Sequence, residues 1–101
     1  MSPLEVSKLM KEGAKIQVID VREPFEYELI NIGGLNLPLS SLREKTDLIE
    51  KEIPVVVLCK SGQRSTQAIR LLQPQGFTNL INMKGGLMAW RDEVDGRLKL
   101  Y

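Results

Sequence analysis

Short apolar runs alternate along this chain with segments in which apolar residues recur at helical spacing. Residues 16–20 and 55–58 are rich in β-branched side chains and are predicted to be buried strands, the second of them central. Residues 35–38 and 80–82 are predicted as a short edge strand and a further strand. Strands that alternate with helices indicate an α/β fold with a central, mostly parallel sheet and helices on both faces.

Helix signals fill the segments between the predicted strands. Ser2 and Glu5 form a capping box around Pro3, and Gly13 is expected to end the helix that follows. Four more helices are expected: over residues 23–29, from Ser40 or Ser41 to about residue 52, from residue 65 to about residue 73, and from Gly85 through Trp90. The segment from residue 95 to residue 101 has no clear pattern.

Length and charge narrow the class of protein. The 101 residues suit one domain over residues 1–101, since two cores would each be too small to be stable. Fourteen basic and thirteen acidic residues leave a net charge of +1, which gives no electrostatic footprint for nucleic acid or an anionic membrane. Neither a secretion signal nor an apolar stretch of roughly eighteen residues occurs, so we expect a cytoplasmic protein without a membrane span.

The counts of cysteine and histidine exclude several chemistries. One cysteine excludes an internal disulfide, and the absence of histidine excludes an ordinary Cys/His zinc site. Hydrolases of the Ser-His-Asp and Cys-His types are also excluded, because the nucleophile would lack its usual proton acceptor.

The single cysteine, Cys59, lies where chemistry is expected. It follows the most apolar predicted strand, and ligand sites in open parallel sheets lie at the carboxyl ends of the strands. The backbone N–H groups from Lys60 to Ser65 can surround a common centre at a helix N-terminus, which favours an anion. With help from Arg64 and Lys60, this pocket predicts a lowered pKa for the thiol. Gly62 suits a positive φ, and Ser65 is expected to cap the helix.

Several residues also have a purely structural interpretation. A lone cysteine after a strand is usually a small buried side chain, but the polar, glycine-containing turn that follows favours a chemical role. Asp20 is expected to cap the next helix or to bind Arg22, and Arg22 could pair with Glu26; a structural role is favoured for that pair. Lys60 either steers anionic donors or points into water. Trp90 and Met88 are expected to pack in the core.

Three motifs carry a family resemblance. Residues 59–65, Cys-Lys-Ser-Gly-Gln-Arg-Ser, resemble the active-site loop of rhodanese-like domains. Residues 19–27 are similar to the earlier signature of that family, and residues 85–90 to the glycine pair and tryptophan of its last helix. The motifs span most of the chain in the family's order.

The resemblance implies a sulfurtransferase with no metal or organic cofactor. Sulfane sulfur would pass from thiosulfate or a persulfide donor to Cys59 and then to a nucleophilic acceptor, with a covalent persulfide between the two steps. The loop backbone would bind the outer sulfur and Arg64 the anionic part of the donor. The implied active-site loop consists of Lys60, Ser61, Gly62, Gln63, Arg64 and Ser65, with Asp20 and Arg22 in support.

Two alternatives stay open at this point. A noncatalytic interaction module on the same fold is one, although the intact loop from Cys59 to Arg64 argues against it. A phosphatase or arsenate reductase is the other. Related phosphatases have one more residue in the loop, whereas four residues separate Cys59 from Arg64 here, and no aspartate lies near the loop in sequence to act as a general acid.

One subgroup of the family fits best. Many members have Gly-His-Ile after the first signature, whereas this chain has Ile-Asn-Ile-Gly-Gly at residues 30–34. Rhodanese domains joined to ubiquitin-like activating enzymes also lack that histidine, and they resemble this chain at residues 22–24, at residues 90–95 and at Tyr101. This resemblance implies a sulfur-carrier protein as acceptor and an adenylating enzyme as partner.

Overall fold

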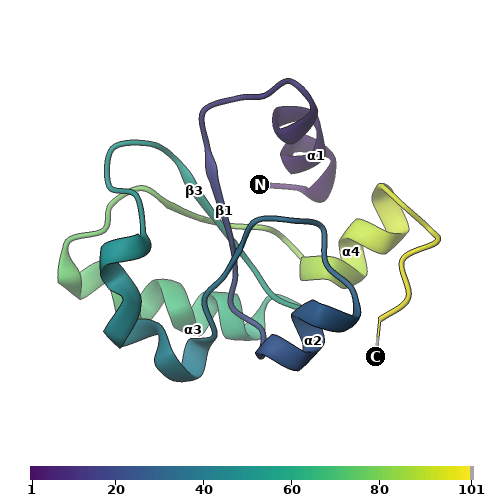
Figure 1. The fold of residues 1–101 in the computed structure, drawn as a ribbon. Helices are drawn as coiled ribbons and strands as arrows, with labels where there is room; N and C mark the ends of the chain where they lie inside the picture. Colours follow the sequence, from purple (N-terminus) through teal and green to yellow (C-terminus); the bar gives the residue numbers. More distant parts are fainter. Residues whose placement is uncertain (101) are drawn as a thin grey trace.

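A four-stranded parallel sheet forms the centre of the computed structural model, which describes residues 1–100. The strand order is β2-β1-β3-β4, and every neighbouring pair is parallel (Figure 1). This order confirms the predicted α/β class and the central position of residues 55–58. It also confirms that the short strand predicted at residues 35–38 lies at an edge of the sheet. The strands are β1 (Gln17–Asp20), β2 (Leu35–Asn36), β3 (Val55–Leu58) and β4 (Leu80–Asn82).

Helices connect the strands, as parallel pairing requires. The capping box of Ser2 and Glu5 is present at the start of the first helix, which ends at Lys11, two residues before Gly13. No helix among residues 1–100 has the length and apolar character needed to cross a membrane. The helices are α1 (Pro3–Lys11), α2 (Pro24–Leu29), α3 (Gln63–Leu72) and α4 (Gly86–Glu93), with 3₁₀ helices η1 (Leu39–Leu48) and η2 (Gln73–Gln75).

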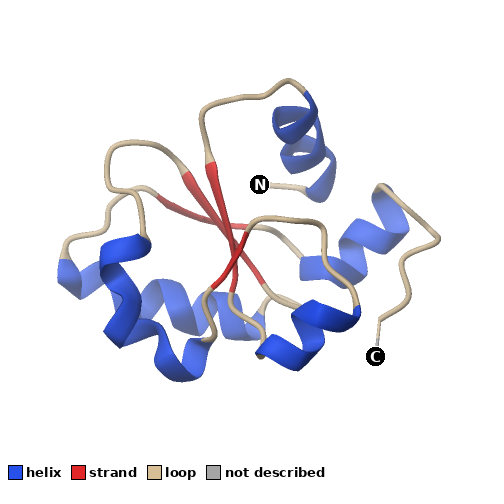
Figure 2. Cartoon of the chain, viewed as in Figure 1, coloured by secondary structure: helices blue, strands red, loops and turns tan. Residues whose placement is uncertain are grey.

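The side chains of the sheet alternate between two apolar layers, so both faces are covered (Figure 2). In β3, Val55 and Val57 face the layer completed by η1 and α3, while Val56 and Leu58 face the layer completed by α1 and α4. All four are at most 1% exposed, which explains why this strand has the most apolar sequence in the chain. Trp90 is buried in the second layer, as predicted, whereas Met88 is 40% exposed, so its predicted core position is wrong.

The segment after β2 departs from the prediction. A helix from Ser40 or Ser41 to about residue 52 was expected, but η1 is a 3₁₀ helix that ends at Leu48 and has a non-helical Lys45. Ile49 then adopts an extended conformation and is 5% exposed. Burial of Ile49 in the core takes the chain out of the helical path, which local sequence signals do not reveal.

The register of the sheet brings the carboxyl ends of three strands together, and a polar residue or the cysteine lies at each of them. Asp20 pairs with Leu58, and Val57 pairs with Asn82. The carboxyl end of β1, the residue after β3 and the carboxyl end of β4 therefore lie side by side. This edge of the sheet holds Asp20, Cys59 and Asn82.

Candidate active site

Cys59 lies at the bottom of the loop between β3 and α3. The residue is 1% exposed, and its Sγ accepts hydrogen bonds from the backbone N–H groups of Gly62 at 3.0 Å and Ser65 at 3.4 Å. The Ser65 hydroxyl lies 3.5 Å from the same sulfur. The loop therefore surrounds the sulfur with hydrogen-bond donors, in the way expected for an anion pocket at a helix N-terminus.

These contacts change the acidity of the thiol. Burial by itself raises the pKa of Cys59, because it removes water from the thiolate. The side-chain hydrogen bond between Cys59 and Ser65, together with hydrogen bonds from the backbone N–H groups of Ser65, Gly62 and Ser61, outweighs that effect, so the pKa is lower than the ordinary value of a cysteine. A thiolate is the nucleophilic form of cysteine, and the groups that lower this pKa include no histidine.

The entry of the loop into α3 corrects one prediction. Gly62, with φ +104°, is the N-cap residue, and Ser65 lies inside the first helical turn. The Ser65 hydroxyl donates to the Asn82 side-chain oxygen at 2.6 Å and is 3.1 Å from the Gly62 carbonyl. Ser65 therefore contacts the sulfur and β4 rather than capping the helix. Asn82 escaped the sequence analysis because only the parallel pairing of β3 and β4 brings it near Cys59.

The start of α4 supports the loop from its carbonyl side. The backbone N–H of Leu87 donates to the Cys59 carbonyl at 2.9 Å, and that of Met88 donates to the Lys60 carbonyl at 3.0 Å. Gly86 has φ +60°, and a Cβ there would lie 2.6 Å from the Lys60 carbonyl oxygen. Only glycine allows this approach. The glycine pair was noted in the sequence as a motif, but its role in holding the loop was not predicted.

Arg64 lies on the outer side of the loop and contacts α2. Its two terminal nitrogens bind the two carboxylate oxygens of Glu26 at 2.6 Å and 3.0 Å. Arg64 is 34% exposed and Glu26 is 14% exposed. The bond to Arg64 lowers the pKa of Glu26, and the bond to Glu26 raises the pKa of Arg64, so the pair is charged at neutral pH.

Asp20 and Arg22 form a separate ion pair that is almost completely buried. The Arg22 guanidinium binds the Asp20 carboxylate at 2.8 Å, and the two side chains are 3% and 0% exposed. Arg22 also donates to the carbonyls of Ile30 at 2.7 Å and Glu26 at 3.4 Å. Asp20 thus binds Arg22, which is one of its two expected roles. Within the described residues 1–100, the expected side-chain pair of Arg22 with Glu26 is not formed, because the Glu26 carboxylate binds Arg64 instead. These contacts attach α2 to the end of β1.

The remaining loop residues lie near the surface. Ser61 and Gln63 are exposed, and Lys60 is half-buried. A hollow beside the loop is lined by Ser61, Gly62, Gln63, Thr66, Gln67, Arg70, Asn82, Lys84 and Gly85.

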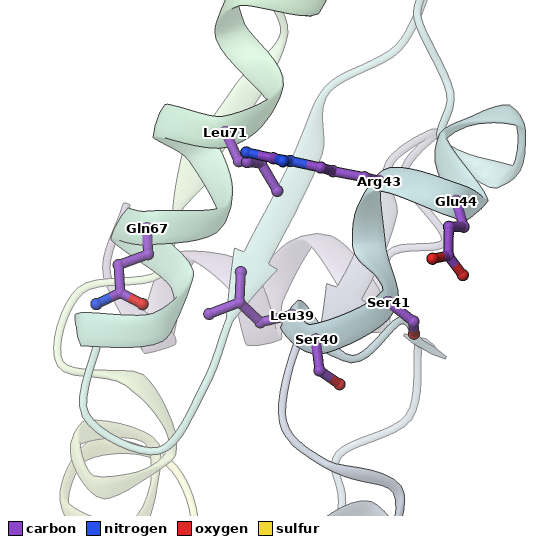
Figure 3. Close-up of a pocket in the computed structure, with 7 residues that line it drawn as sticks. All are labelled: Leu39, Ser40, Ser41, Arg43, Glu44, Gln67 and Leu71. Carbon is purple, nitrogen blue, oxygen red and sulfur yellow. The ribbon is translucent and has the colours of Figure 1, made fainter.

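A second hollow lies between η1 and α3, away from the sulfur (Figure 3). Gln67 and Leu71 come from α3, and the Arg43 side chain extends across the hollow toward Leu71. Cys59 does not line it, so this hollow is not the sulfur site.

Comparison with known proteins identifies the family of this chain. The family model of the rhodanese-like domain matches residues 2–93. The chain is 29% identical over its whole length to the probable adenylyltransferase/sulfurtransferase MoeZ of Mycobacterium tuberculosis, and 34% identical over 96% of its length to adenylyltransferase and sulfurtransferase MOCS3-2 of Zea mays. It spans only 26% and 22% of these two relatives.

A solved structure gives the same answer for the fold. The crystal structure of a rhodanese-related protein from Thermoplasma volcanium superposes with a TM-score of 0.80 at 32% identity, over 93% of this chain and 91% of that one. Fold and loop together define a class of α/β domain with a cysteine at the end of a central parallel strand. The chain belongs to the rhodanese-like domain family, as its three motifs indicated. The subgroup resemblance is confirmed by relatives whose names join an adenylyltransferase to a sulfurtransferase.

Proposed function

We propose that residues 1–101 act as one rhodanese-like domain that transfers sulfane sulfur through a persulfide on Cys59. The observation that carries this proposal is the ring of donors around the Cys59 sulfur, with Gly62 N–H at 3.0 Å and Ser65 N–H at 3.4 Å. The same donors that lower the pKa of the thiol can bind the outer sulfur of a persulfide, which is also an anion.

The reaction has two steps that balance without a metal or a cofactor. In the first, the Cys59 thiolate attacks the outer sulfur of thiosulfate; a sulfur–sulfur bond forms, and the bond to the sulfonate breaks as sulfite leaves with its electron pair. In the second, a nucleophilic acceptor attacks the outer sulfur of the persulfide and restores the thiolate. The N–H groups of the loop bind the negative charge of the thiolate and that of the persulfide, and they stabilise both forms electrostatically.

The partners follow from the same family and from the surface near the loop. We propose a thiosulfate or persulfide-protein donor and a sulfur-carrier protein or adenylating enzyme as partner, in the cytoplasm, where a free thiol stays reduced. Phe25 and Leu29 on α2 are 65% and 59% exposed. α2 contacts the loop through Glu26 and Arg64, and exposed apolar side chains on this helix support contact with a protein.

The alternatives have less support. A phosphatase would need a larger loop and a general acid, whereas Asp20 has no exposed surface and binds Arg22. A noncatalytic module would have no use for a thiol of lowered pKa.

Intact mass measurement tests the proposal directly. After incubation with thiosulfate, the protein should gain the mass of one sulfur atom, and a reducing thiol should remove it. Cys59→Ser should never gain sulfur, while its free energy of unfolding should change by less than about 1.5 kcal/mol, because the serine oxygen can accept the N–H groups of Gly62 and Ser65 that now bind the sulfur. Ser61→Ala is the matched control, because its side chain is exposed and its N–H is retained. A gain of sulfur in Cys59→Ser would contradict the mechanism.

A further inference from the structure

The arginine of the active-site loop is already bound to an anion. Arg64 would be the natural group to attract a doubly charged donor, but both of its terminal nitrogens bind the Glu26 carboxylate, at 2.6 Å and 3.0 Å. A two-point bond of this kind fixes the guanidinium in position and cancels its charge at a distance.

Glu26 is itself held in place, so this pairing is not a chance surface contact. Its Oε1 also accepts the backbone N–H of Glu23 at 3.1 Å, in the capping box of α2. The Glu26 side chain is only 14% exposed. α2 is in turn attached to β1 by Arg22, which donates to the Ile30 carbonyl at 2.7 Å. The carboxylate is thus fixed by a network that does not depend on Arg64.

Arg64 is also close enough to the sulfur to matter electrostatically. The negative charges of Cys59 and Asp20 contribute, after Glu26, to the raised pKa of Arg64. Its neighbour Ser65 donates its backbone N–H to the Cys59 sulfur. A donor that approaches Cys59 therefore meets the Arg64–Glu26 pair as a unit with no net charge.

We propose that Glu26 is a specificity-determining residue that lowers the use of doubly charged sulfur donors relative to donors of lower charge. This inference rests on the proposed function, because it concerns the donor step of the Cys59 persulfide. A dianion gains little attraction from a neutralised arginine and is repelled by the fixed carboxylate. The same carboxylate repels a donor of lower charge less strongly.

Two small donors of similar shape can isolate the effect of charge. Thiosulfate carries two negative charges, and methanethiosulfonate has a methyl group in place of one oxygen and carries one. Attack by the Cys59 thiolate on the outer sulfur gives the same persulfide from both; sulfite leaves from the first and methanesulfinate from the second, each with the electron pair of the broken bond. The ratio of kcat/KM for the two donors therefore measures charge selectivity.

The decisive variant is Glu26→Gln, which removes the charge and keeps an oxygen for the Glu23 N–H. We expect the ratio of kcat/KM for thiosulfate over methanethiosulfonate to rise about tenfold, as removal of one nearby like charge predicts. Glu26→Asp keeps the charge and should stay within about twofold of the parent ratio. Glu28→Gln, an exposed glutamate on the same helix, is the matched control and should also change the ratio by less than about twofold.

An unchanged or lower ratio in folded Glu26→Gln would overturn the inference, since Glu26 would then position Arg64 for donor binding. If that variant does not fold, the salt dependence of the parent protein decides. Because Arg70 and Lys84 also line the hollow beside the loop, the parent is compared with the double variant Arg64→Gln/Glu26→Gln. Loss of a pair with no net charge leaves the fall of the ratio with salt unchanged, and a severalfold smaller fall in that variant would mean that Arg64 is an effective cation and would overturn the inference. Mass measurement separates this failure from that of the proposed function: a parent protein that gains sulfur from neither donor contradicts both.

Discussion

The inner and outer sides of the active-site loop are held by different kinds of contact. On the inner side, backbone hydrogen bonds from Leu87 and Met88, the approach of Gly86 and the Ser65–Asn82 bond fix the main chain around Cys59. On the outer side, the partly exposed Arg64–Glu26 ion pair attaches the loop to α2. We expect the inner side to control the acidity of the sulfur, and the outer side to control the charge that a donor meets near Arg64.

We expect substitutions on the inner side to lower the stability or to change the pKa of Cys59, and substitutions on the outer side to change the use of charged donors. Buried, geometrically constrained contacts lose stability or alter the pKa when changed, because no water can replace them. A partly exposed ion pair contributes little to stability and acts mainly on charged ligands. Three substitutions test this difference, from the largest expected effect to the smallest.

Gly86→Ala should have the largest effect. Its Cβ would lie 2.6 Å from the Lys60 carbonyl oxygen, at a φ of +60°. We expect a loss of about 3 kcal/mol in the free energy of unfolding, measured by urea denaturation. Gly13→Ala is the matched control, with φ +68° and no neighbour within 4 Å, and should lose about 1 kcal/mol. Equal losses in the two variants would mean that backbone strain alone, not contact with the loop, makes Gly86 necessary.

Ser65→Ala should change the pH dependence of persulfide formation. The Ser65 hydroxyl helps to lower the pKa of Cys59, so its removal raises that pKa and reduces the thiolate fraction at low pH. We expect the single-turnover rate to fall roughly tenfold on the acid side of the profile, which is the size of one hydrogen bond to a charged group. At high pH, where both thiols are ionised, the rates should converge. A uniform decrease at every pH would show that Ser65 acts by position instead.

Arg64→Ala should have the smallest effect. Because Glu26 already cancels much of its charge, we expect kcat/KM for thiosulfate to fall only about fivefold and the free energy of unfolding to change by less than about 1 kcal/mol. Arg43→Ala changes the net charge equally in the hollow between η1 and α3, and should leave kcat/KM unchanged within about twofold (Figure 3). A hundredfold fall for Arg64→Ala would make this arginine a direct ligand of the donor and contradict the assignment of the outer side.

The sequence predicted the features that depend on neighbouring residues. The strand of residues 55–58, the loop that follows and the helix after it are local patterns, so the position of Cys59 at a strand end and the positive φ of Gly62 could be expected. The capping box at Ser2 could be expected for the same reason.

The features that were missed depend on contacts between distant segments. Asn82 approaches Ser65 across 17 positions of sequence, and Arg64 meets Glu26 across 38. Nothing in either local pattern specifies the partner. Ser65 was assigned to a helix cap because serine is common there, but tertiary contact with the sulfur and with β4 determines its conformation.

The support of the loop by α4 also has a consequence for synthesis of the chain. A ribosome makes Cys59 before it makes Leu87 and Met88, whose N–H groups bind the loop carbonyls. During that interval the cysteine belongs to a loop without its inner support, and its sulfur lacks the fixed ring of donors. If Cys59 acts as proposed, we expect its pKa to fall only after α4 has docked, so that the nascent chain carries a less acidic thiol than the folded protein does.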